Sequence, residues 1–224
     1  MSRFELSKAK YSYIKLRLCL FCIKENIRNT TSNRQRYFLI RKYLMNYLND
    51  AKIKISVNGL DKLNGLDSLF FLAKADNIYE KFIIYVALSK PIKLVLDEKE
   101  FNGFFYDKII KYLKSNLINY DDIFDEAKKY REIRKDIIDN KKSYLMFTRN
   151  GLFLKDDFNP ILKSKSTIVP IRIINSNLLK EENNEEITIN VEILDLIDYD
   201  NYKNIDKKVI NNFVLKRIEG EENE

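Results

Sequence analysis

The sequence predicts an α+β protein, in which a helical N-terminal part with short strands precedes a β-rich C-terminal part. Residues 4–28 contain no Gly or Pro and are rich in Leu, Ile, Tyr and Phe. The period of the apolar residues changes from helical to alternating after Ser143. A content of 45% hydrophobic and 12% aromatic residues is typical of a globular protein. We expect a mainly helical basic domain over residues 1–140 and a β-rich acidic domain or subdomain with an acidic tail over residues 141–224.

The chain begins with a predicted helical hairpin. Residues 4–28 read as one long helix, in which four basic side chains fall within a sector of about 40° when successive residues are placed 100° apart, namely Lys10, Arg17, Lys24 and Arg28. Asn29 to Asn33 is a polar loop, in which Thr30, Thr31 or Ser32 is suited to cap a second helix that runs to about Asn49.

The next ninety residues predict a short strand, helices and a second strand. Residues 52–57 alternate and end at Asn58-Gly59, which favours a strand and a turn. Helical patterns follow over residues 67–88, either unbroken or interrupted at Asp76, and stop at Pro91, after which residues 92–96 predict a buried strand. Residues 98–117 and 121–139 predict two more helices, the second with acids at its start and lysines at its end.

Strand patterns dominate the last third of the sequence. Residues 144–148 and 152–155 flank Asn150-Gly151, which predicts a hairpin. Residues 167–174, 187–197 and 209–218 are further strand candidates. Pro170 predicts an edge or a bulge in the first of them, because proline cannot donate to a strand ladder.

The charge is unevenly distributed along the chain. From Met1 to Lys54 there are 13 Lys and Arg against three acids, whereas from Asn175 to Glu224 there are 13 acids against six bases. The first quarter therefore attracts polyanions and the last quarter repels them.

Several classes of protein are excluded by composition. The chain has no histidine, which excludes Ser-His-Asp and Cys-His catalysis, and two cysteines alone cannot form a usual zinc site. No Gly-rich nucleotide loop occurs, so no cofactor is expected. No apolar run is long enough to span a bilayer, so we expect a cytoplasmic protein without a membrane partner.

Three motifs have a structural interpretation beside a functional one. Cys19 and Cys22 form a Cys-x-x-Cys pair within the predicted first helix, which favours core cysteines over redox or metal chemistry. Asp97 and Lys99 follow a predicted strand, as a metal ligand and a phosphate-stabilising lysine do in many nucleases, although Asp97 is also suited to cap a helix. The paired acids at 121–122 and 156–157 and the acids at 195–200 fit caps and solvated residues better than a calcium loop.

The leading functional hypothesis is a non-enzymatic intracellular nucleic-acid-binding protein that prefers RNA slightly over DNA. The alternative is an interaction protein from a virus or mobile element in an AT-rich host, which inhibits or adapts a nucleic-acid-handling complex. A third possibility is a magnesium-dependent nuclease. The expected partner of the protein is nucleic acid, or else a protein complex that is acidic or has nucleic acid bound. The predicted phosphate contacts are Lys10, Arg17, Lys24, Arg28, Arg34, Arg36 and Arg41.

Overall fold

A computed structural model of the chain describes residues 16, 18–25, 28, 30–101, 104–180 and 185–221. Seven strands form one sheet in the order β1-β7-β6-β2-β5-β3-β4. Their bounds are β1 (Ile53–Asn58), β2 (Phe70–Ala73), β3 (Ile92–Asp97), β4 (Asn116–Ile118), β5 (Ser143–Phe147), β6 (Ile168–Ile174) and β7 (Ile187–Ile193). All neighbouring strands are parallel except β6 and β7.

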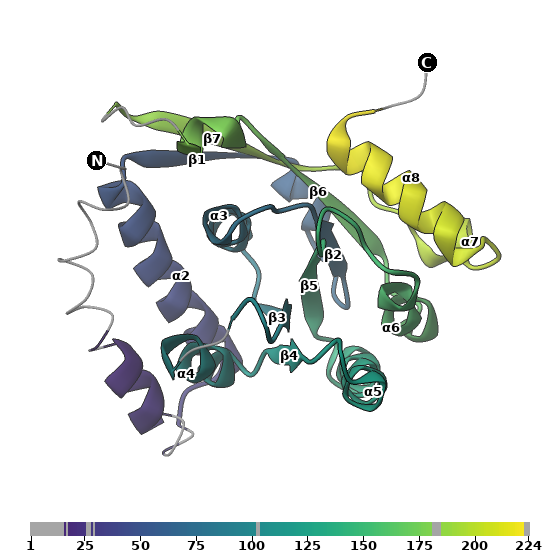
Figure 1. The fold of residues 1–224 in the computed structure, drawn as a ribbon, viewed down its shortest axis with the longest axis horizontal. Helices are drawn as coiled ribbons and strands as arrows, with labels where there is room; N and C mark the ends of the chain where they lie inside the picture. Colours follow the sequence, from purple (N-terminus) through teal and green to yellow (C-terminus); the bar gives the residue numbers. More distant parts are fainter. Residues whose placement is uncertain are drawn as a thin grey trace.

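Helices cover both faces of the sheet (Figure 1). One face carries α2 (Asn33–Asp50), α3 (Ile78–Ala87) and α4 (Phe104–Leu113), and the other carries α5 (Ile123–Asn140), α6 (Phe158–Ser164), α7 (Tyr199–Tyr202) and α8 (Lys207–Glu219). Three short 3-10 helices, η1 (Leu60–Leu63), η2 (Lys155–Asp157) and η3 (Ser176–Lys180), lie in connections. The described part of the chain contains no helix that is long and apolar enough to cross a membrane.

Strand β5, next to the central strand β2, contributes to the cores on both faces. Leu145 and Phe147 belong to the core under α2, α3 and α4, whereas Tyr144 and Met146 belong to the core under α5, α6 and α8. Successive side chains of a strand point to opposite faces, so a strand between two helical layers is apolar throughout. All five residues of β5 are buried, as this arrangement requires.

Several predicted elements are confirmed. Helix α2 begins after Ser32, whose hydroxyl accepts a hydrogen bond from the Gln35 N–H at 3.2 Å and thereby caps the helix. Helix α5 begins after Asp122, which caps it in the same way. Strands β1, β3, β6 and β7 lie within about two residues of the predicted ranges, apart from the end of β7, which stops at Ile193.

Other predictions are wrong, for identifiable reasons. In the helical pattern predicted over residues 67–88, the part before Asp76 is strand β2 and only the part after it is a helix, α3. The helix predicted over residues 98–117 is α4 followed by the first two residues of β4. The strand predicted over residues 209–218 is helix α8, in which Ile210, Val214 and Ile218 recur every four residues and are buried. The hairpin around Asn150-Gly151 is a single bridge between Arg149 and Leu152, because β5 pairs with β2 and β3 instead.

Pro170 lies in an internal strand, so the predicted edge position is also wrong. Its carbonyl accepts a hydrogen bond from the Leu194 N–H at 3.0 Å, one residue beyond the end of β7. The N and the C=O of a strand residue lie on the same side, so the missing N–H of Pro170 faces the place where the β6–β7 ladder stops. The proline therefore costs this sheet one terminal hydrogen bond at most.

The mixture of helices and strands confirms an α+β composition, but the order of a helical part followed by a β-rich part is not confirmed. Strands and helices alternate from Ile53 to Ile193. The division into domains at residue 140 stays a prediction, and the single sheet takes strands from both sides of that position.

Candidate functional site

The carboxyl ends of the central parallel strands form the candidate site. In open sheets of this kind, ligands bind beyond the carboxyl ends of the strands. Ala73 and Phe147 are paired at the ends of β2 and β5, and the Thr148 N–H donates to the Ala73 carbonyl at 3.0 Å. The segment that follows β5 therefore begins next to the end of β2, in the middle of the sheet.

A buried ion pair lies just beyond β5. The Arg149 guanidinium donates to an Asp157 carboxylate oxygen at 2.8 Å, and the Tyr130 hydroxyl donates to the same oxygen. The Leu154 N–H donates to the second carboxylate oxygen at 2.6 Å. The Arg149 guanidinium also lies 3.3 Å from the centroid of the Tyr120 ring. The planar guanidinium is therefore held on one face by a ring and at its edge by a carboxylate.

Burial controls the protonation of this group of side chains. Burial raises the pKa of Asp157, and the Arg149 guanidinium and the hydrogen bonds from Tyr130 and Leu154 oppose that rise. Burial, followed by the nearby Asp157 carboxylate, raises the pKa of Tyr130 far above its usual range, so its hydroxyl remains a donor. Burial tends to lower the pKa of Arg149, but the Asp157 carboxylate together with Tyr120 and Tyr130 outweighs burial and raises that pKa.

Three buried polar atoms beside this ion pair have no hydrogen-bond partner among the described residues. They are the Thr148 Oγ1, the Arg149 Nε and the Asn211 Oδ1. The side-chain amide of Asn211 donates to the Phe153 carbonyl at 2.6 Å, which places this residue of α8 against the segment after β5. Buried polar atoms are almost always paired, so the two unpaired atoms on the adjacent residues Thr148 and Arg149 indicate a place where an outside group completes the hydrogen bonds.

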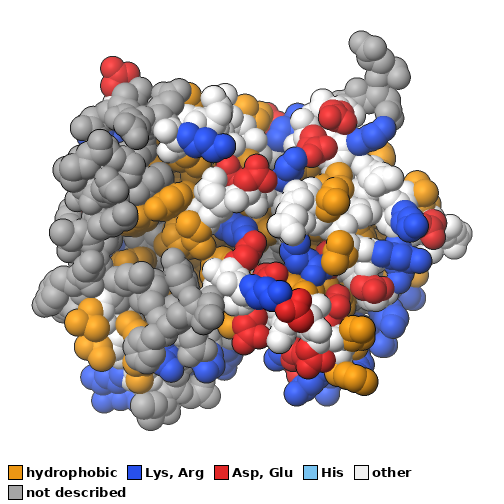
Figure 2. Space-filling model, viewed as in Figure 1, with side chains coloured by type: hydrophobic (Ala, Val, Ile, Leu, Met, Phe, Trp, Pro, Cys, Tyr) orange, Lys and Arg blue, Asp and Glu red, His pale blue; other side chains and the backbone are white. Residues whose placement is uncertain are grey.

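Exposed apolar side chains flank the same segment. Leu152 and Leu154 are about half exposed, and so are Val209 and Phe213, which are one turn apart on α8. The Asn211–Phe153 hydrogen bond ties the two elements together. Figure 2 shows hydrophobic side chains between Lys and Arg side chains over the region where Figure 1 places α8. Apolar residues gathered beside polar groups are a common feature of ligand-binding surfaces.

Three other lysines near this end of the sheet are paired with acids. Lys74 pairs with Glu219, and the buried Lys81 pairs with Glu100. Lys99 pairs with Asp121 at 2.6 Å, while the Asp97 carboxylate accepts the Lys99 N–H at 2.9 Å in a turn rather than at a helix start. The structure therefore gives the predicted Asp97–Lys99 motif a local role in a turn.

The described residues contain no group of three or more His, Cys, Asp and Glu side chains that is arranged to hold a metal ion. Cys19 and Cys22 are free and buried, as the core interpretation predicts. Burial, followed by the effect of Cys19, raises the pKa of the Cys22 thiol to about 12, which suppresses thiolate chemistry at that sulfur.

The structure separates the predicted phosphate contacts. Lys24, Arg28 and Arg34 are exposed, whereas Lys10 and Arg17 lie outside the described residues. Arg36 is 1% exposed and donates to the Tyr112 carbonyl at 3.0 Å, near the end of α4. Arg41 donates to the Val86 carbonyl at 2.8 Å and the Leu88 carbonyl at 3.1 Å, at the end of α3. These two arginines of α2 thus satisfy helix-terminal carbonyls.

The sequence interpretation did not select Thr148, Arg149, Asp157 or Asn211 as functional residues. A signal was present, because a polar residue and an arginine directly follow the buried strand and precede Asn150-Gly151. Such a position at a strand end is where α/β proteins place ligand-binding side chains. The same segment also contains Asn150-Gly151, which favours a hairpin, and a hairpin gives these residues no functional role.

No family model matches the sequence, and no curated protein matches it. Among solved structures, the chain is similar to the 1-acyl-sn-glycerophosphate (LPA) acyltransferase PlsC from Thermotoga maritima. The two share 13% sequence identity and a TM-score of 0.69, over 97% of this chain and 92% of that one. The similarity therefore concerns the fold of nearly the whole chain.

The prediction of a nucleic-acid-binding protein is contradicted by this comparison. Over nearly its whole length, the chain has the fold of a solved lipid acyltransferase. The burial of Arg36 also removes one of the seven side chains on which the prediction depended. The same comparison contradicts the alternatives, which were an inhibitor or adaptor from a virus or mobile element and a magnesium-dependent nuclease.

Proposed function

We propose that this protein binds a single-chain glycerolipid with a phosphate headgroup at the carboxyl ends of β2 and β5, without histidine-based catalysis. The observation that carries the proposal is the pair of unpaired buried donors on the adjacent residues Thr148 and Arg149, near the exposed apolar side chains Leu152 and Leu154 of the same segment. The similarity in fold to an enzyme named for its lysophosphatidate substrate class supports the choice of ligand.

The polar atoms fit a phosphate headgroup. The Thr148 hydroxyl and the Arg149 Nε–H are donors, and phosphate oxygens are strong acceptors. The Asp157 carboxylate and the Tyr120 ring already fix the guanidinium, so little side-chain entropy is lost when the phosphate binds. Because Thr148 is 2% exposed, the phosphate reaches its hydroxyl only when the segment after β5 shifts.

The apolar residues fit the acyl chain. Leu152, Leu154, Val209 and Phe213 are about half exposed in the structure, and an acyl chain that covers them removes apolar surface from water. Burial of apolar surface is worth about 25 cal/mol per Å². The phosphate headgroup and the acyl chain of the lipid would thus occupy neighbouring polar and apolar parts of one surface.

The proposal is binding rather than acyl transfer, because the composition lacks the side chain that most often serves as the base in acyl transfer. Transfer of an acyl group to a hydroxyl requires a base that takes up the hydroxyl proton, and histidine is the side chain used most often near neutral pH. The 224 residues contain none. Binding of the lipid needs no such group.

Calorimetry with a lysophosphatidate below its micelle concentration tests the proposal, with the lysophosphatidylcholine of the same chain length as the comparison ligand. We expect the phosphomonoester lipid to bind at least tenfold more tightly, because hydrogen bonds to a charged group are worth about 1.5–3 kcal/mol. Equal binding of the two lipids would contradict the headgroup site.

The Thr148→Val variant sharpens the test. Valine keeps the shape and removes a hydroxyl that has no partner in the structure, so lysophosphatidate binding weakens about tenfold while the unfolding midpoint does not fall. Thr188→Val on the exposed side of β7 is the matched control. Release of a thiol from an acyl thioester donor in the presence of lysophosphatidate would overturn the non-catalytic part of the proposal.

A further inference from the structure

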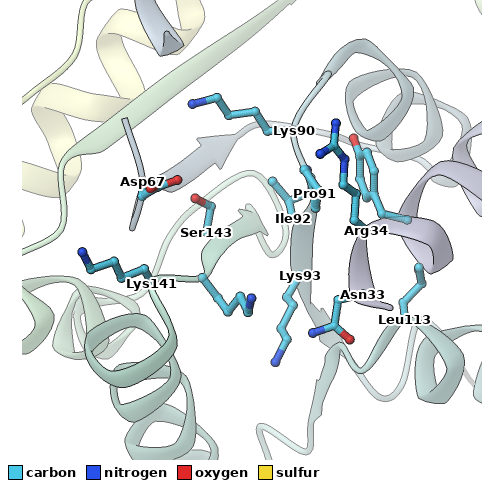
Figure 3. Close-up of a pocket in the computed structure, with 12 residues that line it drawn as sticks. Asn33, Arg34, Asp67, Lys90, Pro91, Ile92, Lys93, Leu113, Lys141 and Ser143 are labelled. Carbon is cyan, nitrogen blue, oxygen red and sulfur yellow. The ribbon is translucent and has the colours of Figure 1, made fainter. Parts of the chain in front are cut away.

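A cavity of 310 Å³ lies at the opposite end of the sheet from the candidate lipid site. Figure 3 shows it between the first residues of α2, the start of β3 and the junction of α5 with β5. Its lining includes Ile92 and Ser143, which are the first residues of β3 and β5. The cavity therefore opens at the amino ends of the same parallel strands.

Cations dominate the polar lining of this cavity. Arg34, Lys90, Lys93, Lys141 and Lys142 line it, and Asp67 is the one acid of the lining. Figure 3 shows the labelled cations around the cavity, with Arg34 on the α2 side and Lys141 on the α5 side. These residues come from α2, β3 and its approach, and the α5–β5 junction, so the fold rather than a single run of lysines brings them together.

Only one of the five cations is neutralised by a carboxylate within the described residues. Lys93 pairs with Asp136 at 2.6 Å. The Lys90 ammonium donates to the carbonyls of Leu63 and Leu66, which orient it without cancelling its charge. Arg34, Lys141 and Lys142 have no ion pair with any described residue. The cavity thus holds an excess of positive charge.

Two further features strengthen the positive potential. Helix α2 has 18 residues and begins at Asn33, which lines the cavity, so the positive end of its dipole points to the same space. Tyr37, Ile92 and Leu113 supply apolar wall, and a low-dielectric wall focuses the field of nearby charges. An anion in this cavity would be attracted by side chains and helix end together.

We propose that this cavity binds a small phosphorylated ligand that carries at least two negative charges, at a site separate from the lipid site. A monocarboxylate would offset only one of four unneutralised cations, whereas a diphosphate offers several acceptor oxygens to Arg34, Lys141 and Lys142. A volume of 310 Å³ is at the lower end of the range for small-molecule pockets, which fits a small phosphorylated molecule.

Calorimetry with inorganic pyrophosphate at low ionic strength tests this site, with glycerol phosphate and malonate as ligands of lower charge or different chemistry. We expect pyrophosphate to bind at least tenfold more tightly than malonate, with an affinity that falls as salt is added. Equal binding of malonate, or no binding of pyrophosphate at low salt, would overturn the proposal.

A double variant and a matched control locate the site. Lys141→Gln/Lys142→Gln should weaken pyrophosphate binding at least tenfold, whereas Lys128→Gln/Lys135→Gln removes the same charge from exposed positions of the neighbouring α5 and should leave it within twofold. An equal loss of affinity in both variants would show that binding depends on net charge alone, and would overturn the proposed site. Competition between pyrophosphate and lysophosphatidate would overturn the claim of separate sites, and independent binding would support it.

Discussion

The two ends of the sheet handle positive charge in opposite ways. At the carboxyl ends of the strands, the partly buried Arg149 is paired with the buried Asp157. At the amino ends, Lys141 and Lys142 face a cavity without a carboxylate partner among the described residues. A buried charge is tolerated only with a partner, whereas a charge that water can reach needs none. The paired Arg149 should therefore matter for folding stability as well as for the proposed headgroup contact, whereas the unpaired Lys141 and Lys142 should matter for ligand binding and little for stability.

The largest effect is expected from Asp157→Asn. The change leaves the Arg149 guanidinium buried beside an amide instead of a carboxylate, and breaking a buried pair in this way costs about 3–5 kcal/mol. Urea unfolding at pH 7 measures the loss. Asp156→Asn is the control, because that neighbouring carboxylate is exposed and should change the free energy of unfolding by no more than about 0.5 kcal/mol. Equal losses would remove the distinction between buried and exposed charge.

The second-largest loss of stability is expected from Arg36→Met, and Arg34→Met, two residues earlier on α2, is its comparison. Arg36→Met leaves the Tyr112 and Thr31 carbonyls without their guanidinium donor, and an unsatisfied buried polar group costs about 1–3 kcal/mol. Arg34→Met removes an exposed cation and should cost about 0.5 kcal/mol or less. A stability unchanged by Arg36→Met would show that water replaces the guanidinium at these carbonyls.

Local signals in the sequence predicted some helices and strands and missed others. Capping residues and alternation predicted α2, α5 and most strands, because those signals are local. Strand β2 was missed because its four residues are all buried, and a short buried strand has the same apolar pattern as a buried helix. Helix α8 was missed because Val209, Ile210 and Val214 favour strands, although their burial follows a helical period.

The site was harder to predict than the fold elements. Arg36 and Arg34 have the same residue type and similar neighbours in sequence, and only the position of α4 makes one of them a buried donor. The pair of Arg149 with Asp157 depends on η2 folding back beside β5. The cationic cavity joins residues 34, 90 and 141, which are far apart in the chain. Such groupings follow from the strand order, which no local signal specifies.

A smaller, pH-dependent effect is expected at the Lys93–Asp136 pair, which is partly buried at the amino end of the sheet. Burial tends to raise the pKa of Asp136, but hydrogen bonds from Lys93, Tyr144 and Asn140 hold that pKa below its usual value. The carboxylate therefore stabilises the fold above its unfolded pKa of about 3.9, and this contribution is lost as the pH falls through the lower folded pKa.

Asp136→Asn should accordingly lower the free energy of unfolding by about 1–2 kcal/mol at pH 7. The difference from the unmodified protein should shrink as the pH is lowered below about 4. Urea unfolding between pH 3 and pH 7 measures it, and Asp139→Asn, an exposed change on the same helix, is the control. A difference that persists unchanged at pH 3 would assign the loss to packing rather than to the charge.

The smallest effect is expected where the comparison is most direct, at the unpaired lysines of the cavity. Lys141 is exposed and Lys142 is half-buried, and neither has an ion pair with a described residue in a cavity that three other basic side chains and one acid, Asp67, line. Lys141→Gln/Lys142→Gln should therefore leave the free energy of unfolding unchanged or raise it by up to about 0.5 kcal/mol at low salt, with the gain disappearing as salt screens the repulsion. Thermal unfolding over a salt series measures the change, and Lys128→Gln/Lys135→Gln corrects for net charge. A loss above about 1 kcal/mol would mean that these lysines support the fold, and the amino end of the sheet would then resemble the carboxyl end.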